Sequence, residues 1–286
     1  MILEKAYAKI NVGLDITGKR HDGYHDIDTI MQSILLHDEI IIEKASGISI
    51  GCSDPTIPVG ESNTVFLAAK VFLEKAGLDP FVNGSRIEII KKIPPKAGLG
   101  GGSSDAAAVI RGLNKLYCTE LSTSIMEELA LKVGSDVPFC IKGGTQRAKG
   151  RGEKLTEINE FEGIPVLLVM PGETVNTAYA YSLFSNAKNA VHPNMDAVAS
   201  AVNIGDLAQL SSFAGNTFES LVFPEKPAIE KAKHDILDTG ALVCQMTGSG
   251  AAVYGLYDTR SHAESAEKTL AETYCTYLTE TTGRNQ

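Results

Sequence analysis

The chain has 286 residues, of which 43% are hydrophobic and 21% charged, an ordinary composition for a globular protein and a length that favours two domains. The net charge of -9 argues against general binding to nucleic acid or to an anionic membrane. No apolar run is long enough to span a bilayer, and patterned sequence follows Met1 without a signal peptide. The five scattered cysteines lack a Cys-x-x-Cys pair, so we expect reduced, mostly buried thiols and a cytoplasmic location.

The N-terminal segment, residues 3–16, alternates polar and apolar side chains and predicts a β-strand. On such a strand Lys9 and Asn11 would share one face, and Ile10 and Val12 would lie on the other. By residue type alone, a lysine and an asparagine on one strand face favour a solvated surface.

A tight turn is predicted at Asp22-Gly23. His21 and His25 lie four residues apart, but Gly23 breaks the helix that a stacked metal-binding pair would need, so we expect no metal site there. Tyr24 and His25, which leave the turn, suit stacking on a planar ring and hydrogen-bonding to it.

A further strand is predicted at residues 38–43 and a helix at residues 65–76. Asn63 lies where an N-cap residue would bond to free backbone N–H groups, and Gly77 follows the last helical residue. Local sequence therefore favours a structural role for Asn63.

A glycine-rich loop joins a predicted strand at residues 86–90 to a predicted helix at residues 105–117. Glycines let backbone N–H groups approach an anion closely, and the start of a helix adds unpaired N–H groups. The serines can cap the helix or offer hydroxyls to a phosphate or a metal. A flexible turn is the alternative, but the pattern predicts a phosphate cradle, formed by Pro94, Pro95, Lys96, Ala97, Gly98, Leu99, Gly100, Gly101, Gly102, Ser103 and Ser104.

The next predicted helix along the chain spans residues 122–133. Asp136 follows it on a turn before Pro138, so its side chain is presented rather than packed, although alone it would be a turn or capping residue. We expect a boundary that divides the chain into domains 1–157 and 158–286. The second domain has predicted strands at 165–171, 241–246, 253–257 and 276–280, helices at 174–184, 196–202, 205–210, 226–238 and 262–272, and a polar loop at 186–194.

Several motifs, spread over nearly the full length, carry a resemblance to a known family. The loop at residues 94–107 resembles an ATP-binding motif, and residues 247–251 (Thr-Gly-Ser-Gly-Ala) resemble a C-terminal glycine motif. Both are typical of the galacto-, homoserine, mevalonate and phosphomevalonate (GHMP) kinase superfamily. Residues 8–11, 22–25 and 134–139 resemble its branch that phosphorylates a cytidine-diphosphate polyol in non-mevalonate isoprenoid synthesis.

The resemblance implies an α+β, two-domain GHMP kinase fold, with an N-terminal domain like ribosomal S5 domain 2 and a ferredoxin-like C-terminal domain. Ligands would lie in the cleft between them. It also implies ATP and Mg²⁺ as cofactors, the ion being held largely by nucleotide and water, with Ser104 as a possible ligand. Small-molecule substrates, rather than nucleic acid or membrane, would be the partners of a monomer or weak homodimer.

The resemblance also assigns roles to residues. Asp136 would accept the proton of the acceptor hydroxyl, and Lys9 would orient that hydroxyl and stabilise developing charge. The loop from Pro94 to Ser104 would hold the ATP phosphates, and Asn63 and Lys91 would lie near adenine.

Substrate recognition would use a second set of side chains. Tyr24 and His25 would stack on the cytosine ring and hydrogen-bond to it, and Tyr181 offers a second stacking face. Asn11 would lie near the polyol hydroxyls.

Three alternative functions are compatible with parts of the sequence. A mevalonate or homoserine kinase is the alternative enzyme, and Tyr24-His25 and the short loop at Asp136 argue against it. A nucleotide-binding protein without catalysis is opposed by the presence of Lys9 and Asp136. An RNA-binding protein is opposed by the negative charge.

Overall fold

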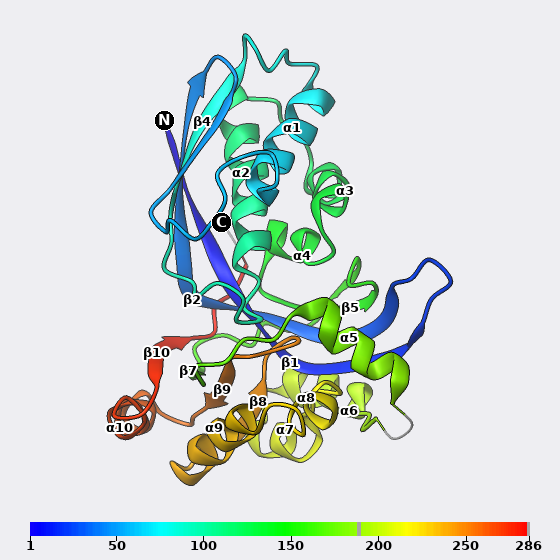
Figure 1. Ribbon diagram of the computed structural model, residues 1–286, viewed down its shortest axis with the longest axis vertical. Coiled ribbons are helices and arrows are strands. Elements are labelled where there is room, and N and C mark those ends of the chain that lie inside the picture. The colour runs from blue at the N-terminus through cyan, green and yellow to red at the C-terminus, as the bar shows by residue number, and fades with distance from the viewer. Residues whose placement is uncertain (188–189, 285–286) are drawn as a thin grey trace.

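A six-stranded sheet with helices packed on one face forms the upper part of the molecule (Figure 1). The computed structural model describes residues 1–187 and 190–284. The strands are β1 (Ile2–Lys19), β2 (His25–Ala45), β3 (Ile48–Cys52), β4 (Gly84–Ile90), β5 (Thr145–Gly150) and β6 (Lys154–Glu157). They run in the order β3-β4-β2-β5-β6, and β1 pairs with β2. The helices are α1 (Thr64–Ala76), α2 (Gly101–Tyr117), α3 (Thr123–Val133) and α4 (Val137–Lys142).

The long hairpin of β1 and β2 is the frame of this sheet. The strand predicted at 38–43 is only the end of β2, which begins at residue 25 because it pairs with β1 along its length. The solvated face expected for β1 is wrong. Lys9 is 4% exposed and Asn11 is 3% exposed, because this part of β1 is covered on both sides.

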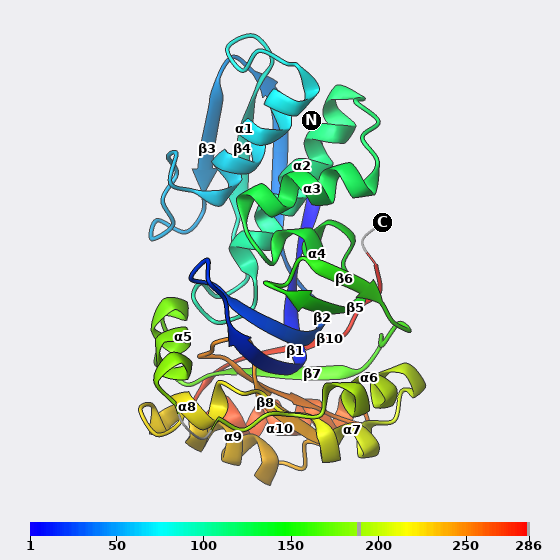
Figure 2. The ribbon, with the colours of Figure 1, turned by 90° about the vertical axis from the view of Figure 1, so that its right-hand side faces the viewer.

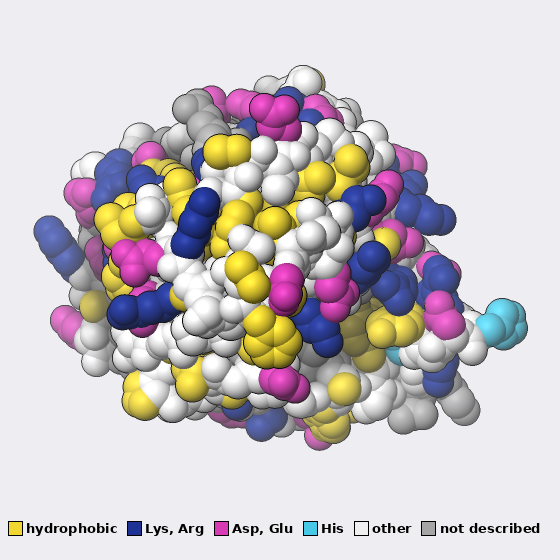
Figure 3. Space-filling model, turned by 90° about the horizontal axis from the view of Figure 1, so that it is seen from above, with side chains coloured by type: hydrophobic (Ala, Val, Ile, Leu, Met, Phe, Trp, Pro, Cys, Tyr) yellow, Lys and Arg dark blue, Asp and Glu magenta, His cyan; other side chains and the backbone are white. Residues whose placement is uncertain are grey.

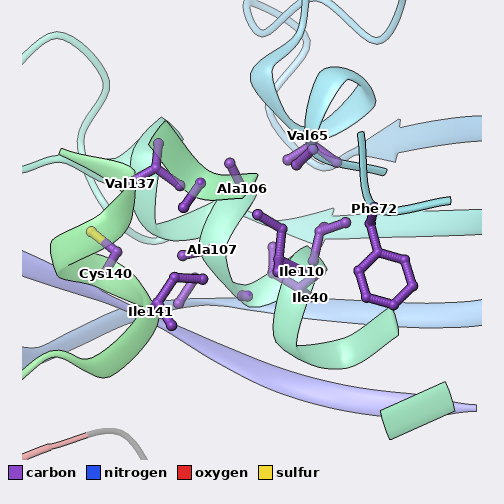
Figure 4. Packing of buried hydrophobic residues seen from close by; sticks show 14 of the residues in the cluster. Ile40, Val65, Phe72, Ala106, Ala107, Ile110, Val137, Cys140 and Ile141 are labelled. Carbon is purple, nitrogen blue, oxygen red and sulfur yellow. The ribbon is translucent and has the colours of Figure 1, made fainter. Parts of the chain in front are cut away.

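Helix α2 lies at the centre of the first hydrophobic core. The helix predicted at residues 105–117 is confirmed, and Figure 4 shows its side chains Ala106, Ala107 and Ile110 directed at α1, α4 and β2. Small alanine side chains let the helix approach its neighbours closely, so that Phe72 and Ile40 fill the remaining space. The helix begins at Gly101, four residues before the predicted start, so that two glycines of the loop belong to its first turn.

A four-stranded antiparallel sheet forms the lower part of the molecule, with most of its helices beneath it (Figure 2). Its order is β10 (Cys275–Glu280), β7 (Pro165–Met170), β9 (Val253–Leu256) and β8 (Val243–Met246). The predicted strands are confirmed within a few residues. The helices are α5 (Thr177–Asn186), α6 (Met195–Ile204), α7 (Leu207–Phe213), α8 (Glu219–Val222), α9 (Pro227–Asp238) and α10 (Arg260–Leu270).

Strand β7 shows how the two sheets are joined. Leu167 and Val169 belong to the core that α9 and α10 complete, whereas Val166 and Leu168 pack with Ile10 and other residues of β1 and β2. Alternating side chains thus face the helices and the first sheet. Because β1 and β2 pack on the second sheet, the domain boundary at 157/158 stays a prediction.

Charged side chains of both signs are present on the surface. Figure 3 shows acidic and basic side chains intermingled on the face seen from above. Among the described residues, no helix combines the length and apolar character needed to cross a bilayer. None of the five cysteines forms a disulfide, but Cys118 and Cys275 are exposed and Cys52 is half-buried, so the expectation of mostly buried thiols holds only for Cys140 and Cys244. The predicted polar loop at 186–194 includes residues 188–189, which lie outside the described residues.

Candidate active site

One cleft of about 1330 Å³ collects the residues singled out in the sequence. It is lined by the hairpin of β1 and β2, by the glycine loop and the start of α2, by α5, and by the turns at 135–136 and 248–249. All the candidate residues line this cleft except Ser104, namely Lys9, Asn11, Tyr24, His25, Asn63, Lys91, Pro94 to Ser103, Asp136 and Tyr181. Residues far apart in the chain therefore meet at one place.

Ser104 does not line the cleft because α2 begins before it. The backbone N–H of Ser104 donates to Gly100 O at 2.9 Å, and its Oγ donates to Gly101 O at 2.9 Å. Both donors are thus used inside the helix. The expectation that a serine caps this helix is also wrong, because Gly100 is the N-cap residue and no side chain caps it.

The glycine loop is held from both sides. Leu99 O accepts a hydrogen bond from Lys9 N of β1 at 3.0 Å, and Ala97 O accepts one from Ala252 N at 3.2 Å. Gly98 has φ +78°, and a Cβ there would lie 2.2 Å from Thr247 O. Only glycine fits this position, where the loop meets the turn after β8.

Lys9, Asn11 and Asp136 form a small polar group in the cleft. Lys9 Nζ donates to Asn11 Oδ1 at 2.7 Å and lies 3.7 Å from Asp136 Oδ2. Asn11 Nδ2 in turn donates to Thr29 Oγ1 at 2.9 Å, which fixes the amide so that its oxygen faces Lys9. Asp136 occupies the N-cap position of α4 but makes no side-chain capping bond, and its side chain is 37% exposed. Its carboxylate is therefore not used to cap α4, and it lines the cleft beside Lys9.

Tyr24 and His25 lie at another part of the same cleft. Tyr24 is 53% exposed, so it is not a core residue, and the Arg151 guanidinium carbon lies 4.4 Å from the centre of its ring. His25 stacks on Tyr181 with centroids 4.8 Å apart and an interplanar angle of 19°, and its Nε2 lies 3.1 Å from Ser185 Oγ. Burial, with a smaller contribution from Lys19, lowers the pKa of His25.

Asn63 and Lys91 are both bound within the protein. Asn63 Oδ1 accepts from Val65 N at 2.8 Å and caps α1, as its position predicted. Lys91 Nζ donates to Asp38 Oδ2 at 2.5 Å and to Asp105 Oδ2 at 2.8 Å. Burial raises the pKa of Asp105 well above its usual range, against the opposing effect of the Lys91 charge.

Sequence reasoning missed five residues that shape the cleft or its walls. Thr29, Asp38 and Arg151 carry no local signal, because their partners are distant in the chain. Asp105 adjoins the loop and Gly248 lies in the C-terminal glycine motif, so these two motifs could have identified both residues as part of the site. A Cβ on Gly248, which has φ +57°, would lie 3.4 Å from Lys9 Nζ.

Two family models match the chain, GHMP kinases N terminal domain at residues 63–144 and GHMP kinases C terminal at residues 195–274. The 4-diphosphocytidyl-2-C-methyl-D-erythritol kinase of Acetivibrio thermocellus is 43% identical, over 91% of this chain and 91% of that protein. The protein of the same name from Lachnoclostridium phytofermentans is 40% identical, over 92% of this chain and 90% of that protein.

Solved structures agree with these relatives. A crystal structure of 4-(cytidine 5'-diphospho)-2C-methyl-D-erythritol kinase matches with a TM-score of 0.83 and 30% identity, over 99% of this chain and all of that chain. Homoserine kinase from Cytophaga hutchinsonii matches with a TM-score of 0.77 at 19% identity, over 99% of this chain and 96% of that chain, which shows the fold alone. The expected two-domain α+β GHMP kinase fold is thus confirmed. The chain belongs to the GHMP kinase superfamily and, within it, to the 4-diphosphocytidyl-2-C-methyl-D-erythritol kinases, which are ATP-dependent phosphotransferases.

Proposed function

We propose that this enzyme transfers the γ-phosphoryl group of ATP to the 2-hydroxyl of 4-diphosphocytidyl-2-C-methyl-D-erythritol, a step of non-mevalonate isoprenoid (terpenoid) precursor synthesis. One observation carries the proposal. A single cleft holds the glycine loop, the pair Lys9 and Asp136, and the exposed aromatic ring of Tyr24. The names of relatives that match 91% and 92% of the chain supply the substrate.

ATP would bind with its phosphates against the loop and the first turn of α2. The first backbone N–H groups of a helix have no partner within the helix, and the helix dipole is positive at that end. Gly101, Gly102 and Ser103 offer these groups, and a Cβ on Gly102 would meet only Thr64 Oγ1, at 3.5 Å. Asn63 and Lys91, which line the same cleft, would lie on the adenine side.

Lys9 and Asp136 would act on the acceptor hydroxyl. The hydroxyl oxygen forms a bond to the γ-phosphorus while the bond from that phosphorus to the bridging oxygen of ADP breaks, and the hydroxyl proton passes to Asp136. Lys9, held by Asn11, would orient the hydroxyl and stabilise negative charge on the transferring group. A weak base suffices, because the proton moves late in such a reaction.

Recognition of cytidine would divide between two rings. Because His25 stacks on Tyr181, a base cannot lie between them in this arrangement, so we assign the main stacking face to Tyr24. His25 would hydrogen-bond the base, and Tyr181 would fix the orientation of His25. Asn11 would lie near the polyol hydroxyls.

Mg²⁺ would accompany ATP in this cleft, where it would neutralise phosphate charge. It prefers oxygen ligands and commonly keeps several waters. Among the described residues, no group of three His, Cys, Asp or Glu side chains is placed so that it could hold a metal ion. The Ser103 hydroxyl and the Asp136 carboxylate line the cleft and could complete the set, whereas the Ser104 hydroxyl is bound to Gly101 O.

Turnover with a panel of acceptors tests the proposed substrate. ADP release would be measured with 4-diphosphocytidyl-2-C-methyl-D-erythritol, mevalonate, homoserine and no acceptor. We expect fast turnover with the cytidine-diphosphate polyol alone. Equal or faster turnover with mevalonate or homoserine would overturn the assignment.

The remaining expectations concern the enzyme in its cell. We propose a cytoplasmic enzyme that acts as a monomer or weak homodimer and binds no nucleic acid. The five cysteines, none of which forms a disulfide, and the net charge of -9 support this proposal.

A further inference from the structure

A buried ionic cluster lies beneath the start of the glycine loop, and the proposed reaction uses none of its carboxylates. Asp38 of β2 is 0% exposed, and its Oδ2 lies 2.5 Å from Lys91 Nζ. Asp105 of α2 is 4% exposed, and its Oδ2 lies 2.8 Å from the same ammonium. The cluster Asp38–Lys91–Asp105 therefore ties β2, the end of β4 and α2 together.

The second oxygen of Asp38 holds the backbone that leads into the loop. Asp38 Oδ1 accepts hydrogen bonds from Lys92 N at 2.5 Å and from Ile93 N at 2.9 Å. Strand β4 ends at Ile90, so these two N–H groups lie beyond its last pairing with β2. A carboxylate that accepts from backbone N–H groups makes stronger bonds than a neutral acceptor. Asp38 thus fixes the direction in which the chain enters the loop.

Lys91 carries this constraint to the proposed nucleotide site. A Cβ on Gly101 would lie 3.3 Å from Lys91 Nζ, so the ammonium lies against the first turn of α2. Lys91 lines the cleft, whereas Asp38 does not. Asp38 can therefore affect a bound nucleotide only through Lys91 and through the loop.

We propose that Asp38, with Asp105 as a second arm, is a positioning residue for ATP. It holds the Lys91 ammonium and the backbone of Lys92 and Ile93 where the nucleotide needs them. Stability alone does not explain the cluster, because buried ion pairs can often be replaced by apolar residues without loss of stability. The inference rests on the nucleotide site of the proposed function.

Steady-state kinetics of Asp38→Ala and Asp38→Asn tests the inference. We expect Asp38→Ala to raise KM for ATP roughly tenfold or more, as the loss of charged hydrogen bonds would, with little change in KM for the cytidine substrate. Asp38→Asn should show a smaller rise, because an amide oxygen still accepts from Lys92 and Ile93 while the ion pair with Lys91 is lost. This order of the two variants is the signature of positioning.

Glu4→Gln is the matched control. Glu4 is a carboxylate of β1, 5% exposed, whose Oε2 lies 3.1 Å from Arg111 Nε of α2, and it does not line the cleft. Glu4→Gln should lower the melting temperature as Asp38→Asn does, but it should leave KM for ATP and KM for the cytidine substrate unchanged. The inference would be overturned if Glu4→Gln and Asp38→Asn, with equally lowered melting temperatures, showed an equal rise in KM for ATP. If Asp38→Ala does not fold, Asp38→Asn and calorimetry of ATP binding give the same comparison.

Two further variants separate this inference from the proposed function. Lys91→Met and Gly102→Val alter the nucleotide site directly. A raised KM for ATP in both of them, with no rise in Asp38→Ala, would refute positioning by Asp38 and leave the site intact. An unchanged KM for ATP in all of them would refute the nucleotide site and the inference with it.

Discussion

Asp136 is the residue on which the proposed chemistry depends most. Asp136→Asn is expected to lower kcat by roughly 10²-fold or more, the usual contribution of a positioned acid or base. The melting temperature should hardly change, because the carboxylate makes no capping bond. ATP affinity should also stay constant, since the phosphates would be held by the loop. Steady-state kinetics would measure kcat, and calorimetry would measure the melting temperature and the affinity for ATP. Turnover near the wild-type value would exclude Asp136 as the base.

Tyr24 tests recognition of the cytidine group at the same scale. Stacking of an aromatic side chain on a base is worth about 1–3 kcal/mol, so Tyr24→Ala should raise KM for the cytidine substrate roughly 5- to 150-fold. KM for ATP should change little. Because the ring is 53% exposed, the melting temperature should remain close to that of the wild type. Tyr24→Phe, which keeps the ring, serves as the control, and an equal loss in both variants would argue against stacking.

The residue types of the site could be predicted from sequence, but their environments could not. Lys9 and Asn11 look like a solvated strand face, since nothing near them in the chain shows that the turn at Thr247 and Gly248 covers them. Asp38 was missed for the same reason, because it bonds to residues more than fifty positions away. Burial of a polar strand face depends on tertiary packing, which local periodicity does not contain.

At the scale of elements, the glycine loop separates structural glycines from ligand-facing ones. Gly98→Ala should destabilise the protein by about 1–2 kcal/mol or more, because its backbone is left-handed and a Cβ would meet Thr247 O. Gly102→Ala should keep stability or raise it by up to about 1 kcal/mol, since alanine favours a helix and the position is open.

The two alanine variants should also differ in ATP binding. Gly102→Ala places a methyl group where the phosphates would lie, so KM for ATP should rise in a stable protein. Denaturant unfolding and steady-state kinetics would measure both properties. A stable Gly102→Ala protein with unchanged KM for ATP would contradict the proposed position of the phosphates.

Elements with strong local signals were predicted well, and elements defined by pairing were not. The capped helix α1 lies within a residue of its prediction because Asn63 and Gly77 mark its ends. Strands β3, β5 and β6 were missed. β5, for example, has the polar sequence Thr-Gln-Arg-Ala-Lys-Gly, and it is a strand because it pairs with β2 and β6. The early start of α2 was missed because glycine disfavours helix, and here packing overrides that preference.

For the molecule as a whole, Asp105 predicts a pH dependence of stability. Its pKa is raised in the folded state by burial, so the folded protein holds this proton more tightly than the unfolded chain does. Its contribution is fully present below the ordinary carboxyl pKa of about 4 and is lost as the pH rises toward the raised value. Asp105→Asn should therefore lose stability less steeply with rising pH, by at most about 1.4 kcal/mol per pH unit. Denaturant unfolding between pH 5 and 8, with the exposed Glu128→Gln as control, would check the slope, and identical slopes for wild type and Asp105→Asn would exclude this proton.

The central claim for the molecule is that it places one phosphate on the polyol of a cytidine-diphosphate substrate. The most direct measurement is ³¹P NMR of the product formed from ATP and 4-diphosphocytidyl-2-C-methyl-D-erythritol, with Asp136→Asn as the inactive control. The account predicts a new phosphomonoester resonance, coupled to the 2-position of the polyol, beside the two retained diphosphate resonances, and ADP in equal amount. A product without that monoester, or ADP formed without any change in the polyol, would contradict it.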